Sequence, residues 1–266
     1  MPVKPPRPYY VPAANEEQVF KAAFRQGLSI VLKGPTGCGK TRFVEAMAHD
    51  LDRPLITVAC HDDLTTADLV GRFLLRGGDT EWVDGPLSRA VRDGAICYLD
   101  EVVEARQDTT VVLHPLADHR RQLPIERLGI TLAAAPGFCL VVSYNPGYQS
   151  VLKDLKDSTR QRMVAIDFGF PSPDVEEKIV ATEAAIDHDR AVELVRLGQA
   201  IRRLETGGLR EVASTRVLIA AGRLIGEGLS PREAARAAIA GPLTDDSTVT
   251  RGLVEMIGVY LADQQA

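Results

Sequence analysis

The chain has 266 residues, of which 45% are hydrophobic and 25% are charged, and its formal net charge is −5. This composition is ordinary for a globular protein and suffices for one large domain or two smaller ones. The negative balance argues against a general nucleic-acid binder, and the sequence holds no apolar run near the ~18 residues that a membrane span needs.

The N-terminal segment, residues 1–14, is rich in proline and is expected to be extended. It lacks the apolar core of a signal peptide, and the four cysteines are far apart in the sequence, with no CxxC pair. Both observations predict a cytoplasmic protein with reduced thiols. Asn15 and Gln18 then form the pattern of a capping box, for a helix that ends at Gly27.

A phosphate-binding loop follows. A β-branched run leads into a Gly-rich turn and then into a helical pattern, which is the context that the GxxxxGK[ST] motif requires. Glycines in such a turn let successive N–H groups point at phosphate oxygens, and the helix adds its positive dipole end. We expect Lys40 to reach the β- and γ-phosphates and Thr41 to hold Mg²⁺. The predicted ATP-binding residues are Gly34, Pro35, Thr36, Gly37, Cys38, Gly39, Lys40 and Thr41.

The segment after the loop helix predicts a strand at residues 55–59. Residues 72–83 have a Gly-Gly-Asp turn at their centre, which predicts a hairpin insert, with a plain surface hairpin as the alternative reading. A helix follows that has Pro86 in its first turn and ends at Gly94.

A buried strand predicted at residues 95–99 ends in an acidic pair, Asp100 and Glu101. About 60 residues after a phosphate loop, such a pair is typical of the second half of a nucleotide site. We expect Asp100 to hold Mg²⁺, directly or through water, and Glu101 to activate the attacking water as general base. Taken alone, an acidic pair after a strand is more often a helix N-terminal charge.

A helix at residues 107–116 and a second hairpin near residues 120–130 precede the next strand, at residues 138–143. Asn145 follows this strand. Ligands bind at the carboxyl ends of parallel strands, so Asn145 is a candidate to orient the water near the γ-phosphate. A turn-forming Asn-Pro is the alternative reading of the same residues.

The last predicted strand, at residues 164–168, follows a helical segment at residues 157–163 that contains Arg160 and Arg162. Beyond the proline-rich boundary at residues 171–173, the sequence predicts helices only. These helices are expected at residues 174–185, 188–203, 214–227, 230–240 and 248–263.

Arg216 lies in the first turn of the third of these helices, where a cation is unfavourable for the helix dipole. A phosphate partner would explain its placement, and so would a surface salt bridge. Together the elements predict an α/β domain with a parallel five-stranded sheet at residues 1–170, followed by a small all-α domain at residues 171–266.

A P-loop, a strand ending in Asp-Glu, a strand ending in Asn and a small helical lid together resemble the AAA+ ATPases, and the two hairpin inserts resemble those of the MoxR group. Four blocks resemble the CbbQ/NorQ branch more closely, and the resemblance covers nearly the whole chain. The blocks are Lys33–Glu45, Ala59–Leu64, Leu99–Asp108 and Ser143–Leu152.

The resemblance implies a homo-hexameric ring with ATP between neighbouring subunits. It also implies a partner with a von Willebrand factor A domain and a metalloenzyme as target. In that family, CbbQ proteins act with CbbO to release inhibitory sugar phosphates from rubisco, and NorQ proteins act with NorD in the maturation of nitric oxide reductase. Our leading hypothesis is a rubisco activase subunit. The nitric oxide reductase role and a nucleotide-switched binding module remain as alternatives.

The resemblance also assigns roles to residues. Lys40 and Thr41 match Walker A, and Asp100 and Glu101 match Walker B. The remaining roles implied are sensor 1 for Asn145, sensor 2 for Arg216, and the arginine finger for Arg162 or Arg160.

Overall fold

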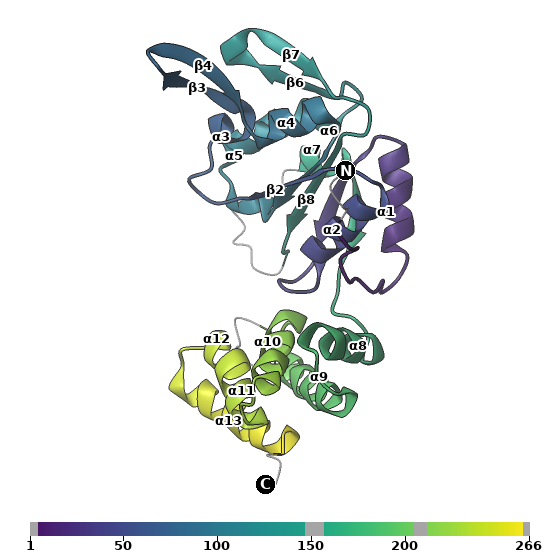
Figure 1. Cartoon of the computed structure of the whole chain (residues 1–266), viewed down its shortest axis with the longest axis vertical. Helices are drawn as coiled ribbons and strands as arrows, with labels where there is room; N and C mark the ends of the chain where they lie inside the picture. Colours follow the sequence, from purple (N-terminus) through teal and green to yellow (C-terminus); the bar gives the residue numbers. More distant parts are fainter. Residues whose placement is uncertain (1–4, 147–156, 205–211, 263–266) are drawn as a thin grey trace. The chain divides into compact units, whose positions relative to one another are not determined.

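The computed structural model of the chain describes residues 5–146, 157–204 and 212–262. It forms two compact units, of which one comprises residues 1–35 and 40–168 and the other comprises residues 36–39 and 169–266. The first unit is an α/β structure and the second is helical (Figure 1).

The first unit is built around a five-stranded sheet in the order β2-β5-β8-β1-β9, in which every neighbouring pair of strands is parallel. This result confirms the predicted α/β class with a parallel five-stranded sheet. The strands are β1 (Ser29–Lys33), β2 (Leu55–Ala59), β5 (Ile96–Asp100), β8 (Cys139–Tyr144) and β9 (Met163–Asp167).

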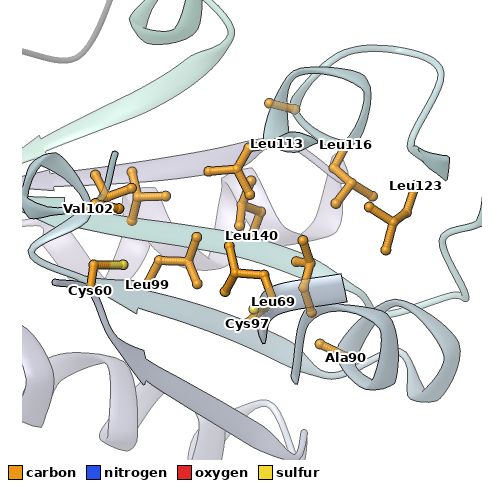
Figure 2. Close-up of a cluster of buried hydrophobic side chains, with 14 of the residues drawn as sticks. Cys60, Leu69, Ala90, Cys97, Leu99, Val102, Leu113, Leu116, Leu123 and Leu140 are labelled. Atoms are coloured by element: carbon orange, nitrogen blue, oxygen red, sulfur yellow. The ribbon is translucent and has the colours of Figure 1, made fainter. Parts of the chain in front are cut away.

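Helices cover both faces of this sheet, because strand side chains alternate between the faces. Ile96 and Tyr98 of β5 pack in one hydrophobic cluster with α1 (Glu16–Arg25) and α2 (Lys40–Asp50). Cys97 and Leu99, the intervening residues, pack in a second cluster with α4 (Pro86–Asp93), part of which Figure 2 shows. The sheet is therefore the middle of three layers.

Shorter elements join these layers. Helix α4 begins with Pro86 at its first position and ends at Gly94 in the left-handed conformation, as its sequence predicts. The other elements are α3 (Thr66–Val70), the 3₁₀ turns Val102–Glu104 and Val111–Leu113, α5 (Gln107–Thr110), α6 (His114–Ala117) and α7 (Asp157–Arg160).

Two antiparallel hairpins extend from the first unit (Figure 1). The first pairs β3 (Gly71–Arg76) with β4 (Asp79–Asp84), and Phe73 and Trp82 stack edge to face across it with ring centroids 5.2 Å apart. The second pairs β6 (Gln122–Ile125) with β7 (Ile130–Ala133), joined by the 3₁₀ turn Glu126–Leu128.

The predicted capping box of α1 is wrong, since Asn15 makes no side-chain cap hydrogen bond. The Glu16 carboxylate instead accepts hydrogen bonds from the backbone N–H groups of Ala13 and Ala14, at 2.6 and 2.8 Å, and from the Tyr10 hydroxyl at 2.7 Å. The Glu16 carboxylate therefore closes the turn that precedes α1.

Two predicted helices are shorter than expected. The segment at residues 107–116 is divided between α5, a 3₁₀ turn and α6, because Pro115 has no N–H to donate within a continuous helix. The segment at residues 157–163 is helical only to Arg160, because Met163 pairs with Ser29 and belongs to β9. Sheet pairing overrides helical propensity there.

The second unit packs its helices around a separate hydrophobic cluster that includes Leu194, Leu218 and Ile257. Its elements are α8 (Pro173–Ala184), α9 (His188–Arg203), α10 (Thr215–Gly226), α11 (Pro231–Ala235), the π-helical turn Arg236–Ala240, α12 (Gly241–Leu243) and α13 (Ser247–Tyr260). Among the residues that the structure describes, no helix combines the length and the apolar character needed to cross a membrane.

Candidate nucleotide site

The phosphate loop connects the end of β1 to the start of α2, the arrangement that its sequence predicts. Gly34 lies so close to Phe168 that a Cβ atom would stand 2.4 Å from the Phe168 carbonyl oxygen. Gly39 has open space around it but a φ of +99°, a backbone conformation that residues with a side chain rarely adopt. The loop therefore requires glycine at these positions for two different reasons.

Lys40 begins α2, and its side chain folds back over the loop. Its ammonium group donates hydrogen bonds to the carbonyl oxygens of Gly34, at 2.8 Å, and of Pro35, at 3.0 Å. These neutral acceptors leave the positive charge of Lys40 without a carboxylate partner among the contacts that the structure gives it. A phosphate group is the kind of ligand that this buried cation would attract.

Asp100 ends β5 and lies opposite the start of α2. Thr41 Oγ1 is 3.4 Å from Asp100 Oδ2, and the Tyr98 hydroxyl donates to Asp100 Oδ1 at 2.7 Å. Ser143 Oγ, from the adjacent strand β8, donates to the same Oδ1 atom at 2.5 Å. The Asp100 carboxylate is thus held by hydroxyl groups from three elements.

The donor set at this point fits Mg²⁺, which prefers hard oxygen ligands from carboxylates and hydroxyls. Asp100 Oδ2 and Thr41 Oγ1 supply one of each, next to a loop suited to phosphate. They are the residues of the described structure that would hold the ion.

Glu101 follows Asp100 in the left-handed conformation, with φ 53° and ψ 49°. Non-glycine residues adopt this conformation only where their surroundings hold it, and such residues concentrate at functional sites. Its backbone N–H donates to Ser143 Oγ at 3.0 Å, and its side chain is half-buried.

Cys60 follows β2 beside this acidic pair, and its backbone N–H donates to the Asp100 carbonyl oxygen at 2.9 Å. Burial, with smaller contributions from the charges of Asp100 and Glu101, raises the pKa of the Cys60 thiol to about 12. The thiol is therefore neutral at physiological pH and is not a nucleophile.

Asn145 follows β8, which pairs with β5 on one side and with β1 on the other. Because the sheet is parallel, the carboxyl ends of these three strands meet at one edge. The structure therefore brings buried Asn145 to the edge that carries the phosphate loop and the acidic pair.

The two candidate finger arginines lie at and just after the end of α7. Arg160 is half-buried, whereas the side chain of Arg162 is 37% exposed, with its Nε 4.0 Å from Asp118 Oδ2. Asp118 pairs more closely with Arg120, at 2.6 Å, and hydrogen bonding from Arg120 lowers the pKa of Asp118 to about 2. Arg162 is therefore the more exposed of the two arginines. Its contact with Asp118 is long, and Asp118 has a closer partner in Arg120.

Arg216, the predicted sensor 2 residue, is exposed at the second position of α10 in the other unit. The helix start beside it is fixed by a buried cluster. Thr215 Oγ1 donates to the Glu176 carboxylate at 2.6 Å, and Arg202 donates two hydrogen bonds to the same group at 2.6 and 2.8 Å.

The sequence reading missed Tyr98 and Ser143. Both are polar groups within otherwise apolar strands, each two positions before a predicted site residue, Asp100 or Asn145. Side chains two apart on a strand share a face. A hydroxyl at this spacing was the signal that could have identified them.

The chain matches two described sequence families. Residues 29–163 match the AAA domain (dynein-related subfamily), and residues 176–260 match the CbbQ/NirQ/NorQ C-terminal family. The segment Gly147–Leu152 of the CbbQ/NorQ-like block lies outside the described residues of the structure.

Curated relatives are similar over nearly their whole length. The denitrification regulatory protein NirQ of Stutzerimonas stutzeri is 59% identical over 256 residues, covering 96% of this chain and 93% of the relative. Protein NorQ of Paracoccus denitrificans is 59% identical, with 94% and 92% covered. Protein CbbQ of Hydrogenophilus thermoluteolus is 56% identical, with 90% of each covered.

Solved structures share the fold at low sequence identity. A RuvB variant from Thermotoga maritima has a TM-score of 0.58 at 13% identity, covering 94% of this chain and 72% of the other. A protein from Cytophaga hutchinsonii has a TM-score of 0.53 at 16% identity, covering 95% and 91%. These likenesses bear on the fold alone.

Proposed function

The chain belongs to the CbbQ/NirQ/NorQ family of AAA+ ATPases, and from this membership we propose that it is an ATP-driven motor that remodels a metalloenzyme. It works in the cytoplasm, as a homo-hexameric ring, with a partner that carries a von Willebrand factor A domain. The observation that carries the proposal is the edge of the sheet where Lys40, Thr41, Asp100 and Glu101 lie together.

The proposed hydrolysis divides the work among these residues. Lys40 binds the β- and γ-phosphates, and Thr41 and Asp100 hold Mg²⁺, which when bound neutralises charge on the phosphate oxygens. Glu101 takes a proton from the attacking water, and Asn145 orients that water. The contact of Lys40 with neutral carbonyls and the oxygen pair of Thr41 and Asp100 support the first two roles.

The ring supplies what one subunit lacks. An arginine reaching across the seam neutralises charge on the γ-phosphate, and Arg162 is our choice for this residue, with Arg160 as the alternative. The exposure of the Arg162 side chain supports the choice. Arg216 is proposed as the sensor 2 residue that contacts the phosphates of ATP.

Two targets are consistent with the relatives. Rubisco, relieved of inhibitory sugar phosphates with a CbbO-like partner, is the target that the likeness to CbbQ suggests. Nitric oxide reductase is the target that the likeness to NorQ suggests. The relatives named NirQ and NorQ are 59% identical to this chain and the relative named CbbQ is 56% identical, so the similarity does not rank the two targets.

The test is to delete the gene from its host and to purify the tagged chain from that host's extract. Loss of rubisco activation, restored in vitro by the chain, ATP and the co-purified partner together, supports the first target. Loss of nitric oxide reductase activity with normal rubisco supports the second. If both enzymes stay fully active in the deletion strain, the remodelling proposal is wrong.

The same purified components separate a motor from a nucleotide-switched binding module. A motor must turn over ATP to do its work, so its hydrolysis rate should rise when the partner and the target are added. A switch needs only binding, and a non-hydrolysable ATP analogue would then activate the target as well as ATP does.

A further inference from the structure

Ser143 lies beside the acidic pair of the candidate nucleotide site and contacts both of its residues. It is fully buried on β8, and its hydroxyl makes one hydrogen bond to each residue of the acidic pair. A hydroxyl has one proton and two lone pairs, whereas the Glu101 backbone N–H can only donate. The Ser143 hydroxyl must therefore donate its hydrogen bond to Asp100 and accept the one from the Glu101 N–H.

We propose that Ser143 is a positioning residue that locks the Asp100 side chain and the Glu101 backbone in place together, with Tyr98 as a second donor to Asp100. This inference rests on the proposed roles of Asp100 and Glu101 in ATP hydrolysis. It assigns to β8 a role beyond carrying Asn145.

On the Asp100 side, both hydroxyl donors reach the same carboxylate oxygen. Ser143 donates to Oδ1 at 2.5 Å and Tyr98 donates to it at 2.7 Å, from the two strands β8 and β5. The other oxygen, Oδ2, is left on the side of Thr41. Fixing Oδ1 restrains rotation of the carboxylate, so Oδ2 stays beside Thr41 Oγ1, the other residue that would hold the cation.

On the Glu101 side, Ser143 accepts a hydrogen bond from a residue whose backbone is strained. Glu101 leaves the strand in the left-handed conformation, and the 3₁₀ turn that follows closes with a hydrogen bond from Glu104 N–H to the Glu101 carbonyl at 2.8 Å. Ser143 holds the N–H side of the same residue. The N–H and the carbonyl group of Glu101 are thus both hydrogen-bonded, which fixes the backbone position from which its side chain projects.

Packing alone does not explain a serine at this position. The residues before it in β8, Leu140, Val141 and Val142, are apolar and buried, and burial of a hydroxyl is unfavourable unless it is hydrogen-bonded. The two acidic-pair contacts account for the hydroxyl, whereas an alanine would pack in the strand without it.

The experiment compares Ser143→Ala with Ser143→Thr, which keeps the hydroxyl, and with Ser88→Ala. Ser88 is the matched control because it is also fully buried, but its hydroxyl donates to the Val70 carbonyl at 2.6 Å, on α4 and away from the acidic pair. ATPase rates are measured on assembled wild-type and variant proteins. Thermal unfolding reports on general destabilisation.

We expect Ser143→Ala to lower kcat by about 10- to 100-fold, with KM for ATP within about threefold of wild type, since a misplaced group slows chemistry more than binding. Ser143→Thr should recover most of the rate. Ser88→Ala should lose stability without this selective loss of kcat. Equal kcat in Ser143→Ala and wild type, or an equal loss in Ser88→Ala, would overturn the positioning role.

A second readout does not depend on turnover. The affinity for a non-hydrolysable fluorescent ATP analogue is measured in EDTA and in Mg²⁺, for wild type, Ser143→Ala and the isosteric Tyr98→Phe. We expect unchanged affinity in EDTA and, for both variants, a gain on adding Mg²⁺ that is smaller than in wild type by up to about threefold, the range expected for KM. If both variants gain as much affinity on adding Mg²⁺ as wild type does, the role at Asp100 is refuted. If Ser143→Ala does not fold, a wild-type gain in Tyr98→Phe alone refutes it.

Failure here is distinguishable from failure of the proposed function. If Glu101→Gln stalls hydrolysis while Ser143→Ala does not, the positioning role is wrong and the site assignment stands. If Glu101→Gln itself hydrolyses normally, the site assignment is wrong. Neither result depends on the identity of the target enzyme.

Discussion

Lys40 and Glu101 have different work in the proposed mechanism, and their variants should fail in different ways. We expect Lys40→Ala to abolish ATP binding, because it removes the buried cation that faces the loop carbonyls. Glu101→Gln should bind ATP normally and hydrolyse it about 10²- to 10⁴-fold more slowly, the usual contribution of a general base. Binding of a fluorescent ATP analogue and phosphate release measure the two effects separately. A wild-type rate in Glu101→Gln would show that another group activates the water.

The predictability of the site also differs residue by residue. The phosphate loop and the acidic pair follow from local patterns, since each depends on residues adjacent in the chain. Ser143 could not be linked to Asp100 because the two residues lie 43 positions apart and only the strand order brings them together. Tyr98 is two positions from Asp100 on the same strand, so its contact was within reach of the sequence pattern. Sequence reading works where chemistry is local and fails where a hydrogen bond joins two strands.

At the scale of single elements, the N-terminal segment is tied to the first two helices by an ion-pair cluster. Arg7 contacts Asp50 at 2.7 Å and Glu17 at 2.9 Å, and Lys21 contacts Asp50 at 3.3 Å. The hydrogen bond from Arg7 lowers the pKa of Asp50 to about 2. Asp50 is therefore ionised in the folded chain at any pH above this value.

The cluster predicts a pH-dependent contribution to stability. A carboxylate whose folded pKa is depressed stabilises the fold above its unfolded pKa, about 3.9, and loses this contribution as the pH falls towards 2. We expect Asp50→Asn to lower the free energy of unfolding by about 0.5–1 kcal/mol at pH 7, the scale of partly exposed ion pairs. Denaturant titrations at several pH values should show the difference shrinking between pH 4 and pH 2. A difference independent of pH would mean that the charge of Asp50 contributes nothing.

Close helix packing in the second unit gives a further prediction. A Cβ atom added at Gly222 of α10 would stand 2.7 Å from Ala184 Cβ, at the end of α8. We expect Gly222→Ala to destabilise this unit by about 1–3 kcal/mol through overpacking. Gly252→Ala is the control, because Gly252 is exposed within α13 with no atom within 4 Å of its added Cβ. That change should stabilise the helix by about 0.5–1 kcal/mol. Thermal unfolding of both variants decides the matter, and destabilisation of the same size in both would point to a cause other than packing.

The type of an element was predictable where the hydrophobic pattern was strong, and uncertain where a residue could join either a helix or a strand. The apolar strand runs and the proline and glycine at the ends of α4 specify these elements locally. Met163 could not be placed from its neighbours, because its assignment to β9 depends on pairing with Ser29, far away in the chain. The capping box of α1 also did not follow from its spacing, because the structure closes the turn before this helix with the Glu16 carboxylate.

At the scale of the whole molecule, the proposed ring makes hydrolysis a property of the seam between subunits. In this proposal a single chain carries Lys40, Asp100 and Glu101, and the arginine that completes the site would come from the neighbouring subunit. Binding of ATP and its hydrolysis should therefore respond differently to the loss of Arg162. This separation is the signature of a residue that acts in trans.

We expect Arg162→Ala to leave ATP affinity of the isolated subunit nearly unchanged and to lower the ATPase of the ring by about 10³-fold or more, the scale of an arginine finger. Arg120→Ala is a matched control, since Arg120 also pairs with Asp118 but is not a finger candidate. Mixed rings then provide the decisive measurement. Arg162→Ala and Glu101→Gln subunits are each inactive alone, yet some seams in a mixture regain both groups, so activity should partly return. Full exchange of subunits without any recovery would assign the finger to Arg160 or give Arg162 a role within its own subunit.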